Sequence, residues 1–450
     1  MKKLLLIAYF FPPMGGAGVQ RALKIANYLP AFGWQPIVVA GPRVPPSDRW
    51  SPTDHSLAEE LDERVAVEHV EASPDELSRN ASFQRLNRWL GLPSVFSRWW
   101  RRVATRRCSE VLRNTPVDLV LATMSPFESA KVACRAAELA KVPWVADLRD
   151  PWALDEMAVY PTALHRRIEI RRMLTTLSRS SLTIVNTREA ASRLRAEAES
   201  KGLSINMDVV TNGFDLRDFD ASIPERSDGK FRIVHTGYLH TEMGERYDSK
   251  RIYRRWLGGI CSGVEFLTRS HVYLMRALHE LKRNHPKLAD CVEVHLVGRL
   301  SKGDMRIVEE SGLQDQVFCP GYLSHSEAVA YMRSADLLFL PMHNLSQGQR
   351  ATIIPGKTFE YIASGCPILG AVPDGDARDL LTGMDRAFVT RPDDVQGMAA
   401  ILLQRIEAWQ AAGRRPEARP VPPDVLQYER QEQVERIACR LNDISTSRPI

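Results

Sequence analysis

The sequence predicts an α/β protein with two doubly wound domains, each a parallel sheet covered by helices on both faces. Three observations lead to this prediction. Short, continuously apolar runs alternate with segments of helical periodicity along most of the chain, as parallel sheets require. A polar, turn-rich stretch at Pro224 to Lys230 interrupts the alternation, which then begins again. A chain of 450 residues is long enough for two domains of ordinary size.

The first domain is expected over residues 1–222. It opens with an apolar strand at Leu4 to Ala8 and a helix over Val19 to Leu29. Because the apolar run is short and leads into a glycine-rich turn, we interpret it as a buried strand and not as a signal peptide. The other apolar runs of this half predict five more strands, at Ile37 to Ala40, Val117 to Ala122, Val142 to Ala146, Leu182 to Val185 and Met207 to Val210.

The second domain is expected over residues 230–412, with an insertion at about 242–268. Its strands are predicted at Arg232 to His235, Val292 to Val297, Val317 to Cys319, Leu337 to Leu340 and Pro367 to Gly370. Helices are predicted near His271 to Lys282, Ser326 to Arg333 and Thr358 to Ala363. After a Pro/Arg-rich linker, residues 424–450 are expected to form a last helix, about Leu426 to Leu441, that crosses back to the first domain.

Composition restricts the class of protein. The chain is 44% hydrophobic and 26% charged, an ordinary globular composition, and its net charge of +5 is too mild to indicate nucleic acid. Seven scattered cysteines form no CxxC pair, which is typical of reduced thiols in a cytoplasmic protein. No apolar stretch is long enough to span a bilayer. We therefore expect a cytoplasmic protein, or one held at the inner face of the cytoplasmic membrane.

Two segments point to phosphate chemistry. In the first, Gly15, Gly16 and Gly18 lie between a strand and a helix, where they allow a ligand close to the backbone and to the helix N-terminus. The same glycines also fit a tight loop without a ligand, because their spacing differs from the GxGxxG fingerprint. In the second, Lys357 begins a helix and Glu360 follows one turn later. A diphosphate bound by the lysine and a ribose bound by the carboxylate would explain this pair, but a surface ion pair would too.

The segment Pro355 to Leu369 resembles the donor-binding helix of glycosyltransferase family 4, whose members are retaining enzymes of the GT-B fold. The opening strand and glycine turn are similar to those of the family, and Thr211 to Asp215 resembles its Asn-Gly-x-Asp segment. Other similar positions are Val297-Gly298, Gly321-Tyr322, Ser334 to Pro341 and the motif Arg149-Asp150-Pro151-Trp152. The resemblance implies two Rossmann-like domains that face a central cleft, and a hexosyltransferase-like activity in the synthesis of a cell-surface glycan or lipid-linked precursor.

The resemblance also implies roles for particular residues. Those expected to bind the nucleotide-sugar donor are Gly16, Gly237, Arg269, Gly298, Lys357, Thr358 and Glu360. Those expected to bind the acceptor are Gly15, Gly18 and Asp147, and Arg149 and Asp150 are expected at the reacting groups. An alternative for Asp150 is an N-cap before Pro151.

Three departures from the family pattern affect these roles. Thr352 occupies the position of an earlier glutamate that contacts the donor sugar in many members. Arg149 replaces a frequent histidine. The insertion displaces a phosphate-binding arginine, for which we nominate Arg269, with a solvated helix-start residue as the alternative.

No cofactor or metal is expected. Asp374-Gly375-Asp376 imitates a metal-binding DxD motif, but its position between a strand and a helix favours an N-cap and turn.

Residues 85–107 combine Trp89, Trp99 and Trp100 with several arginines. This composition suits contact with an anionic membrane. It suits equally a helix with its tryptophans in the core, and less well single-stranded nucleic acid. We expect no nucleic-acid partner.

Two other functions stay open. One is a non-catalytic protein that binds a nucleotide sugar or a polyanion, and the other is a nucleotide-sugar epimerase of the same fold.

Overall fold

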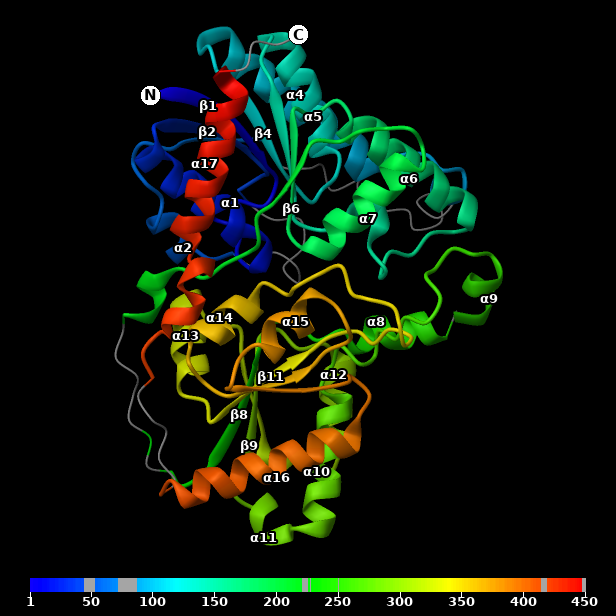
Figure 1. The fold of residues 1–450 in the computed structure, drawn as a ribbon, viewed down its shortest axis with the longest axis vertical. Helices are drawn as coiled ribbons and strands as arrows, with labels where there is room; N and C mark the ends of the chain where they lie inside the picture. Colours follow the sequence, from blue (N-terminus) through cyan, green and yellow to red (C-terminus); the bar gives the residue numbers. More distant parts are fainter. Residues whose placement is uncertain are drawn as a thin grey trace. The chain divides into compact units, whose positions relative to one another are not determined.

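The computed structural model describes residues 1–43, 53–71, 87–220, 226, 228–249, 251–413 and 419–446. The chain forms two compact units: unit 1 comprises Met1–Asn212 and Arg430–Ile450, and unit 2 comprises Gly213–Glu429. The boundary between the two units lies after Asn212. The domain boundary expected at residue 222 falls outside the described residues. In each unit, helices flank a central sheet (Figure 1).

The sheet of unit 1 is parallel, with seven strands in the order β3-β2-β1-β4-β5-β6-β7. The strands are β1 Lys2–Ala8, β2 Trp34–Ala40, β3 Ala66–His69, β4 Leu119–Met124, β5 Trp144–Leu148, β6 Leu182–Val185 and β7 Met207–Val209. The helices are α1 Ala17–Tyr28, η1 Leu29–Phe32, α2 Ser56–Glu59, α4 Val95–Asn114, α5 Ser129–Ala140, η3 Trp152–Leu154, α6 Ala163–Leu177, α7 Arg188–Glu199 and α17 Arg430–Thr446.

The six strands predicted for this half are all present. Leu4 to Ala8 have no exposed surface, because β1 lies at the centre of the sheet with helices on both faces. The prediction missed β3, an edge strand of four residues that contains Glu68 and His69 and therefore lacks a continuous apolar run. The order of the strands reverses next to β1: β2 and β3 follow on one side of it, and β4 to β7 follow on the other. Doubly wound sheets bind ligands at such a point, at the carboxyl ends of the strands.

The sheet of unit 2 is also parallel, with six strands in the order β10-β9-β8-β11-β12-β13. The strands are β8 Phe231–Thr236, β9 Val292–Val297, β10 Val317–Gly321, β11 Leu337–Pro341, β12 Ile368–Ala371 and β13 Ala387–Thr390. The helices are η4 Leu216–Phe219, α8 Thr241–Asp248, α9 Arg251–Trp256, α10 Val272–Asn284, α11 Pro286–Ala289, α12 Lys302–Glu310, η5 Gln314–Gln316, α13 His325–Arg333, α14 Lys357–Ala363, α15 Asp376–Thr382, α16 Val395–Ala411 and η6 Pro423–Tyr428.

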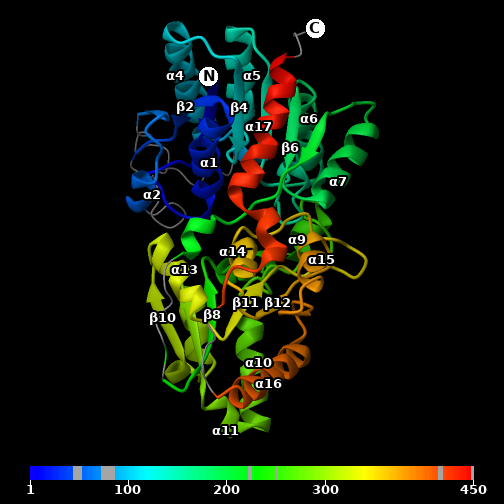
Figure 2. The ribbon, with the colours of Figure 1, turned by 60° about the vertical axis from the view of Figure 1, so that its left-hand side comes forward.

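The five strands predicted for the second half are confirmed, and β13 was missed because it is a short, half-buried edge strand. The insertion at 242–268 contains α8 and α9. The last helix begins at Arg430 and not at Leu426, since Pro422 and Pro423 favour the 3-10 turn η6 before it. This helix, α17, lies along α1 (Figure 2). Arg440 of α17 forms an ion pair with Asp208 at 2.9 Å.

Candidate functional site

Three glycines lie at the carboxyl ends of adjacent strands in unit 2. Gly237 follows β8 with φ +94°, Gly298 follows β9 with φ +140°, and Gly321 ends β10 with φ +83°. The amide of Gly237 donates to Val297 O at 2.7 Å, and that of Gly298 donates to Gly321 O at 2.8 Å. A Cβ atom on Gly298 would lie 2.9 Å from Gly237 O, so only glycine permits this close approach. The carboxyl edge of this sheet is therefore a compact, glycine-lined floor.

The side chain of Lys357 reaches this floor from the first residue of α14. Its ammonium group donates to the carbonyl oxygen of Thr236 and lies 3.3 Å from His235 Nε2. His235 Nδ1 lies 3.0 Å from Phe339 O, which only accepts, so Nδ1 carries the proton and Nε2 accepts from the lysine. Burial and the charge of Lys357 hold the pKa of His235 well below its usual range, which keeps the ring neutral.

Lys357 is itself strongly perturbed. Burial, and then the positive charge of Arg269, lower its pKa from 10.5 to about 7, and Glu360 offsets part of this effect. Arg269 is half-buried and precedes α10. Two cationic side chains thus share one partly buried region, an arrangement that an anion between them would stabilise. This proximity favours the phosphate-binding interpretation of Arg269 over that of a solvated helix start.

The remaining residues expected around the donor differ in accessibility. Among the described residues, the Glu360 carboxylate has no hydrogen-bond or ion-pair partner, and it is half-buried one turn after Lys357. Thr358 is fully buried, and its hydroxyl has no partner within the described part of the chain. Thr358 is therefore closed to solvent, and contact between its hydroxyl and a donor stays a prediction. Thr352 is buried as well.

In unit 1, the glycine turn leads into α1. Gly16 has φ +87° and caps α1 without a side-chain hydrogen bond, and its carbonyl oxygen accepts from the Val19 amide at 3.1 Å. Arg149 reaches this helix from the end of β5: its guanidinium donates to Gly18 O and, at 3.1 Å, to Met124 O. The guanidinium also lies 5.6 Å from the centre of the Phe10 ring. The structure thus brings Arg149 and Gly18 together at the carboxyl ends of β1, β4 and β5.

Asp147 has a different environment from the one expected of an acceptor ligand. Its carboxylate is fully buried and forms an ion pair with Arg21 of α1 at 2.7 Å. Arg21 also donates to Val210 O at 3.1 Å and to Thr211 O at 2.8 Å. The pair therefore ties α1 and β5 to Val210 and Thr211, which follow β7. Contact between Asp147 and an acceptor stays a prediction.

The neighbouring Asp150 is exposed. It is not an N-cap: η3 is capped by Pro151 without a side-chain hydrogen bond. The alternative that we considered for Asp150 is thus wrong, and its carboxylate is open to solvent. Trp152, in the same motif, has φ +51°, stacks on Phe127 at 4.9 Å and donates from Nε1 to Glu169 of α6 at 2.9 Å.

Asp374 to Asp376 form a turn into α15, with Gly375 as the N-cap at φ +138°. The expected turn is present, although glycine and not an aspartate provides the cap. Within the described ranges, no three His, Cys, Asp or Glu side chains are grouped so that they could hold a metal ion.

Residues 87–107 of the segment 85–107 are described, whereas residues 85 and 86 lie outside the described residues. Contact of this segment with a membrane stays a prediction. Trp99 and Trp100 are buried on α4, where Trp100 Nε1 donates to Ser129 Oγ at 3.1 Å. These two tryptophans therefore belong to the core of unit 1, as the structural alternative predicted, because helical periodicity places them on the inner face. Trp89 is exposed before α4. In the described part of the chain, no helix is long and apolar enough to cross a membrane.

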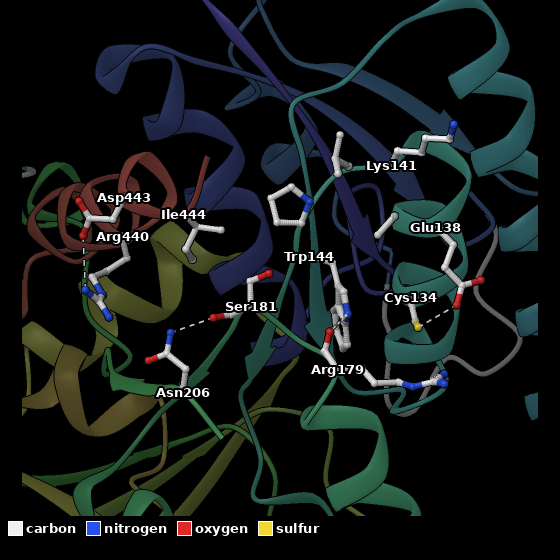
Figure 3. Close-up of a pocket in the computed structure, with 13 residues that line it drawn as sticks. Cys134, Glu138, Lys141, Trp144, Arg179, Ser181, Asn206, Arg440, Asp443 and Ile444 are labelled. Carbon is white, nitrogen blue, oxygen red and sulfur yellow. Dashed lines mark hydrogen bonds and ion pairs between the residues drawn. The ribbon is translucent and has the colours of Figure 1, made fainter. Parts of the chain in front are cut away.

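A pocket of about 860 Å³ opens elsewhere in unit 1 (Figure 3). Its lining includes Trp144, Ser181 and Asn206, which stand at the amino ends of β5, β6 and β7. Because doubly wound sheets bind substrates at the carboxyl ends of their strands, we do not assign this pocket to the reaction.

Sequence reasoning missed His235 and Tyr361. The Tyr361 hydroxyl accepts from the Thr236 amide at 2.9 Å, so α14 is fixed to the end of β8 next to the lysine. His235 was predicted only as a strand residue. Its position directly before the Thr-Gly pair that ends β8 was the available signal.

Comparison with known proteins supports the architecture. Solved structures match nearly the whole chain at low identity. Sucrose-phosphate synthase from Thermosynechococcus elongatus is 14% identical with a TM-score of 0.62, and the match covers 98% of both chains. A UDP-forming α,α-trehalose-phosphate synthase from Burkholderia xenovorans is 13% identical with a TM-score of 0.64, covering 99% of this chain and 100% of the other.

The chain has the GT-B fold. A third match is Anabaena HepE, solved in complex with UDP-glucose. It is 17% identical to this chain with a TM-score of 0.60, and the match covers 98% of this chain and 100% of HepE. No protein-family model matches the sequence, and no curated protein does. The similarity thus lies in the fold, two α/β units that each contain a parallel sheet, and not in the sequence as a whole.

Proposed function

We propose that the protein is a glycosyltransferase that moves a sugar from a nucleotide-diphosphate sugar to an acceptor, with retention of anomeric configuration. The observation that carries the proposal is the pair of cationic side chains, Lys357 and Arg269, beside the glycine floor of unit 2. A diphosphate has the charge to neutralise both, and Gly237, which has no side chain, lets the Lys357 ammonium group lie at the end of β8.

The same residues suit the chemistry of sugar transfer. Negative charge develops on the leaving diphosphate as the bond to the sugar breaks, and fixed cations stabilise that charge more than they stabilise the substrate. The Glu360 carboxylate, free of partners among the described residues, would accept hydrogen bonds from the ribose hydroxyls. Gly16 would lie near the donor, while Gly15, Gly18 and Asp147 would contact the acceptor.

Arg149 and Asp150 are proposed at the reacting groups. Arg149 would act as a cation towards the sugar or its phosphate, and the exposed Asp150 would orient the acceptor hydroxyl. We nominate no protein nucleophile. The proposed acceptor is a glycan or a lipid-linked precursor. Contact with an anionic membrane surface is a separate proposal that does not depend on the reaction.

Donor binding tests the proposal first. UDP-, GDP-, dTDP- and ADP-sugars are compared for thermal stabilisation, beginning with UDP-glucose, the ligand of HepE. A donor at one hundred times its Kd should add about 2.7 kcal/mol of stability. If none of the four raises the melting temperature, the donor site is wrongly assigned.

One observation favours a second candidate, a non-catalytic nucleotide-sugar-binding protein. Buried Thr352 occupies the position expected for a glutamate that contacts the donor sugar. Release of nucleotide from a bound donor in the presence of a lipid extract distinguishes the two, because a binding protein would be stabilised by the donor without consuming it.

A further inference from the structure

Exposed apolar side chains of unit 1 gather on a turn and a helix. Trp89, Leu90 and Leu92 form the turn before α4, and Leu164 and Ile168 lie on α6. Leu90 and Leu164 are the most exposed, at 62% and 63% of their surface. Large contiguous apolar patches are uncommon on soluble monomers, and where they occur they usually mark a contact surface.

Two polar contacts and one ring contact hold the turn against α6. His165 Nε2 lies 2.9 Å from the Trp89 carbonyl oxygen, and the two rings meet edge to face at 6.3 Å. Arg172 donates to Gly91 O at 3.3 Å. The turn is therefore held against α6, and we call Trp89, Leu90, Leu92, Leu164 and Ile168 the apolar surface.

Arginines adjoin this surface. Leu164, Ile168, Arg171 and Arg172 follow one another at helical spacing along a single face of α6, whereas Met173, Leu174 and Leu177 face the core. Arg88 and Arg167 are exposed next to the apolar residues. The one acidic residue of α6, Glu169, is engaged by Trp152 Nε1 and Arg172.

We propose that this surface binds an anionic lipid bilayer, with the apolar side chains among the acyl chains and the arginines at the headgroups. Apolar residues beside a row of arginines are complementary to such a bilayer, since each part meets its own layer of the membrane. A second copy of the chain would offer the arginines no free acidic partner on α6, because Glu169 is already engaged by Trp152 and Arg172.

The surface is also connected to the residues proposed at the reacting groups. On its inner side, α6 holds Trp152 through Glu169, and Trp152 belongs to the segment that carries Arg149 and Asp150. Membrane binding would thus bring a lipid-linked acceptor towards this segment; that consequence rests on the proposed function, whereas membrane binding itself does not.

Co-sedimentation with vesicles tests the proposal on the full chain. Vesicles of phosphatidylcholine and phosphatidylglycerol in equal parts are compared with phosphatidylcholine alone. The wild type should bind the anionic vesicles, and high salt should weaken binding because it screens the arginines. Leu90→Ser combined with Leu164→Ser should weaken binding about tenfold, as should Arg171→Gln combined with Arg167→Gln.

Leu139→Ser is the matched control, because Leu139 is an exposed leucine of unit 1 at the end of α5 that leads to the amino end of β5 and is not one of the residues of the apolar surface. It should bind vesicles as the wild type does. Absent binding by the wild type would overturn the proposal, and so would equal binding by the double variants. A dimer by light scattering that the double leucine variant abolishes would assign the surface to a second copy instead. UDP-glucose stabilisation measured on the same samples reports separately on the proposed function.

Discussion

A Cβ atom built on Gly237 would lie 3.0 Å from the ammonium nitrogen of Lys357. The backbone at Gly237 is in the left-handed region, at φ +94°, where side chains other than that of glycine are strained. Because Gly237 has no side chain, the ammonium group of Lys357 can lie at the end of β8.

We expect Gly237→Ala to weaken UDP-glucose binding at least about tenfold, because the methyl group would displace the ammonium group. Gly312→Ala is a matched control: Gly312 has φ +65°, and an added Cβ would meet nothing within 4 Å. Both variants should lose about 1 kcal/mol of stability from backbone strain. Calorimetric titration compares them, and equal affinities would show that Gly237 matters only for its backbone.

Replacing Lys357 by Met should have opposite effects on stability and binding. The pKa of the folded lysine, about 7, lies below its ordinary 10.5, so the group destabilises the ligand-free fold below pH 7. That cost fades as the pH rises above 7 towards 10.5.

Near pH 6, ligand-free Lys357→Met should therefore melt no lower than the wild type. Its affinity for UDP-glucose should nevertheless fall about 10- to 100-fold, because a charge-assisted hydrogen bond is lost. Melting curves with and without ligand measure both effects. A variant that melts earlier but keeps its affinity would assign the lysine a purely structural role.

Glu360→Gln should distinguish the contribution of the ribose to donor binding from that of the diphosphate. If the carboxylate binds the ribose, the variant loses about tenfold in UDP-glucose affinity, since a neutral amide is a weaker acceptor. Its affinity for inorganic pyrophosphate should stay unchanged, because pyrophosphate has no ribose. Competition titrations give both values, and an equal loss for both ligands would contradict the ribose assignment.

Asp147→Asn should destabilise unit 1 by about 3 kcal/mol, because it leaves the buried Arg21 guanidinium without its counter-charge. Glu138→Gln, in the exposed pair with Arg135, is the control and should cost less than about 1 kcal/mol. Urea denaturation measures both. If Asp147→Asn keeps its stability but raises the KM for acceptor, Asp147 is an acceptor ligand and not a structural residue.

The sequence allowed the interior of the fold to be predicted but not its edges. Strands such as β1 and β11 are continuous apolar runs because they are covered on both faces. The edge strands β3 and β13 are short and half-buried, so their sequences carry little periodic signal. The tryptophans of α4 show a related limit. Basic and aromatic residues at helical spacing are compatible both with a membrane-facing helix and with a helix that packs on the core. Only the packing of α4 on α5 shows that Trp99 and Trp100 belong to the core.

The candidate site was predictable where its residues are close in the chain. Lys357 and Glu360 are one helical turn apart, so their spacing alone suggested a common face. The contacts of Lys357 with His235 and Thr236, and the ion pair of Arg21 with Asp147, join residues more than a hundred positions apart. They depend on which strands are neighbours in each sheet, which local patterns do not specify.

Proton uptake on binding tests the central claim most directly, that Lys357 and Arg269 hold the donor diphosphate. At pH 8 most Lys357 side chains of the free protein are neutral, whereas a bound diphosphate favours the protonated form. Titration of UDP-glucose in two buffers of different ionisation enthalpy should show uptake of about one proton, and Lys357→Met should abolish it. Binding of UDP-glucose by the wild type without proton uptake would contradict this account.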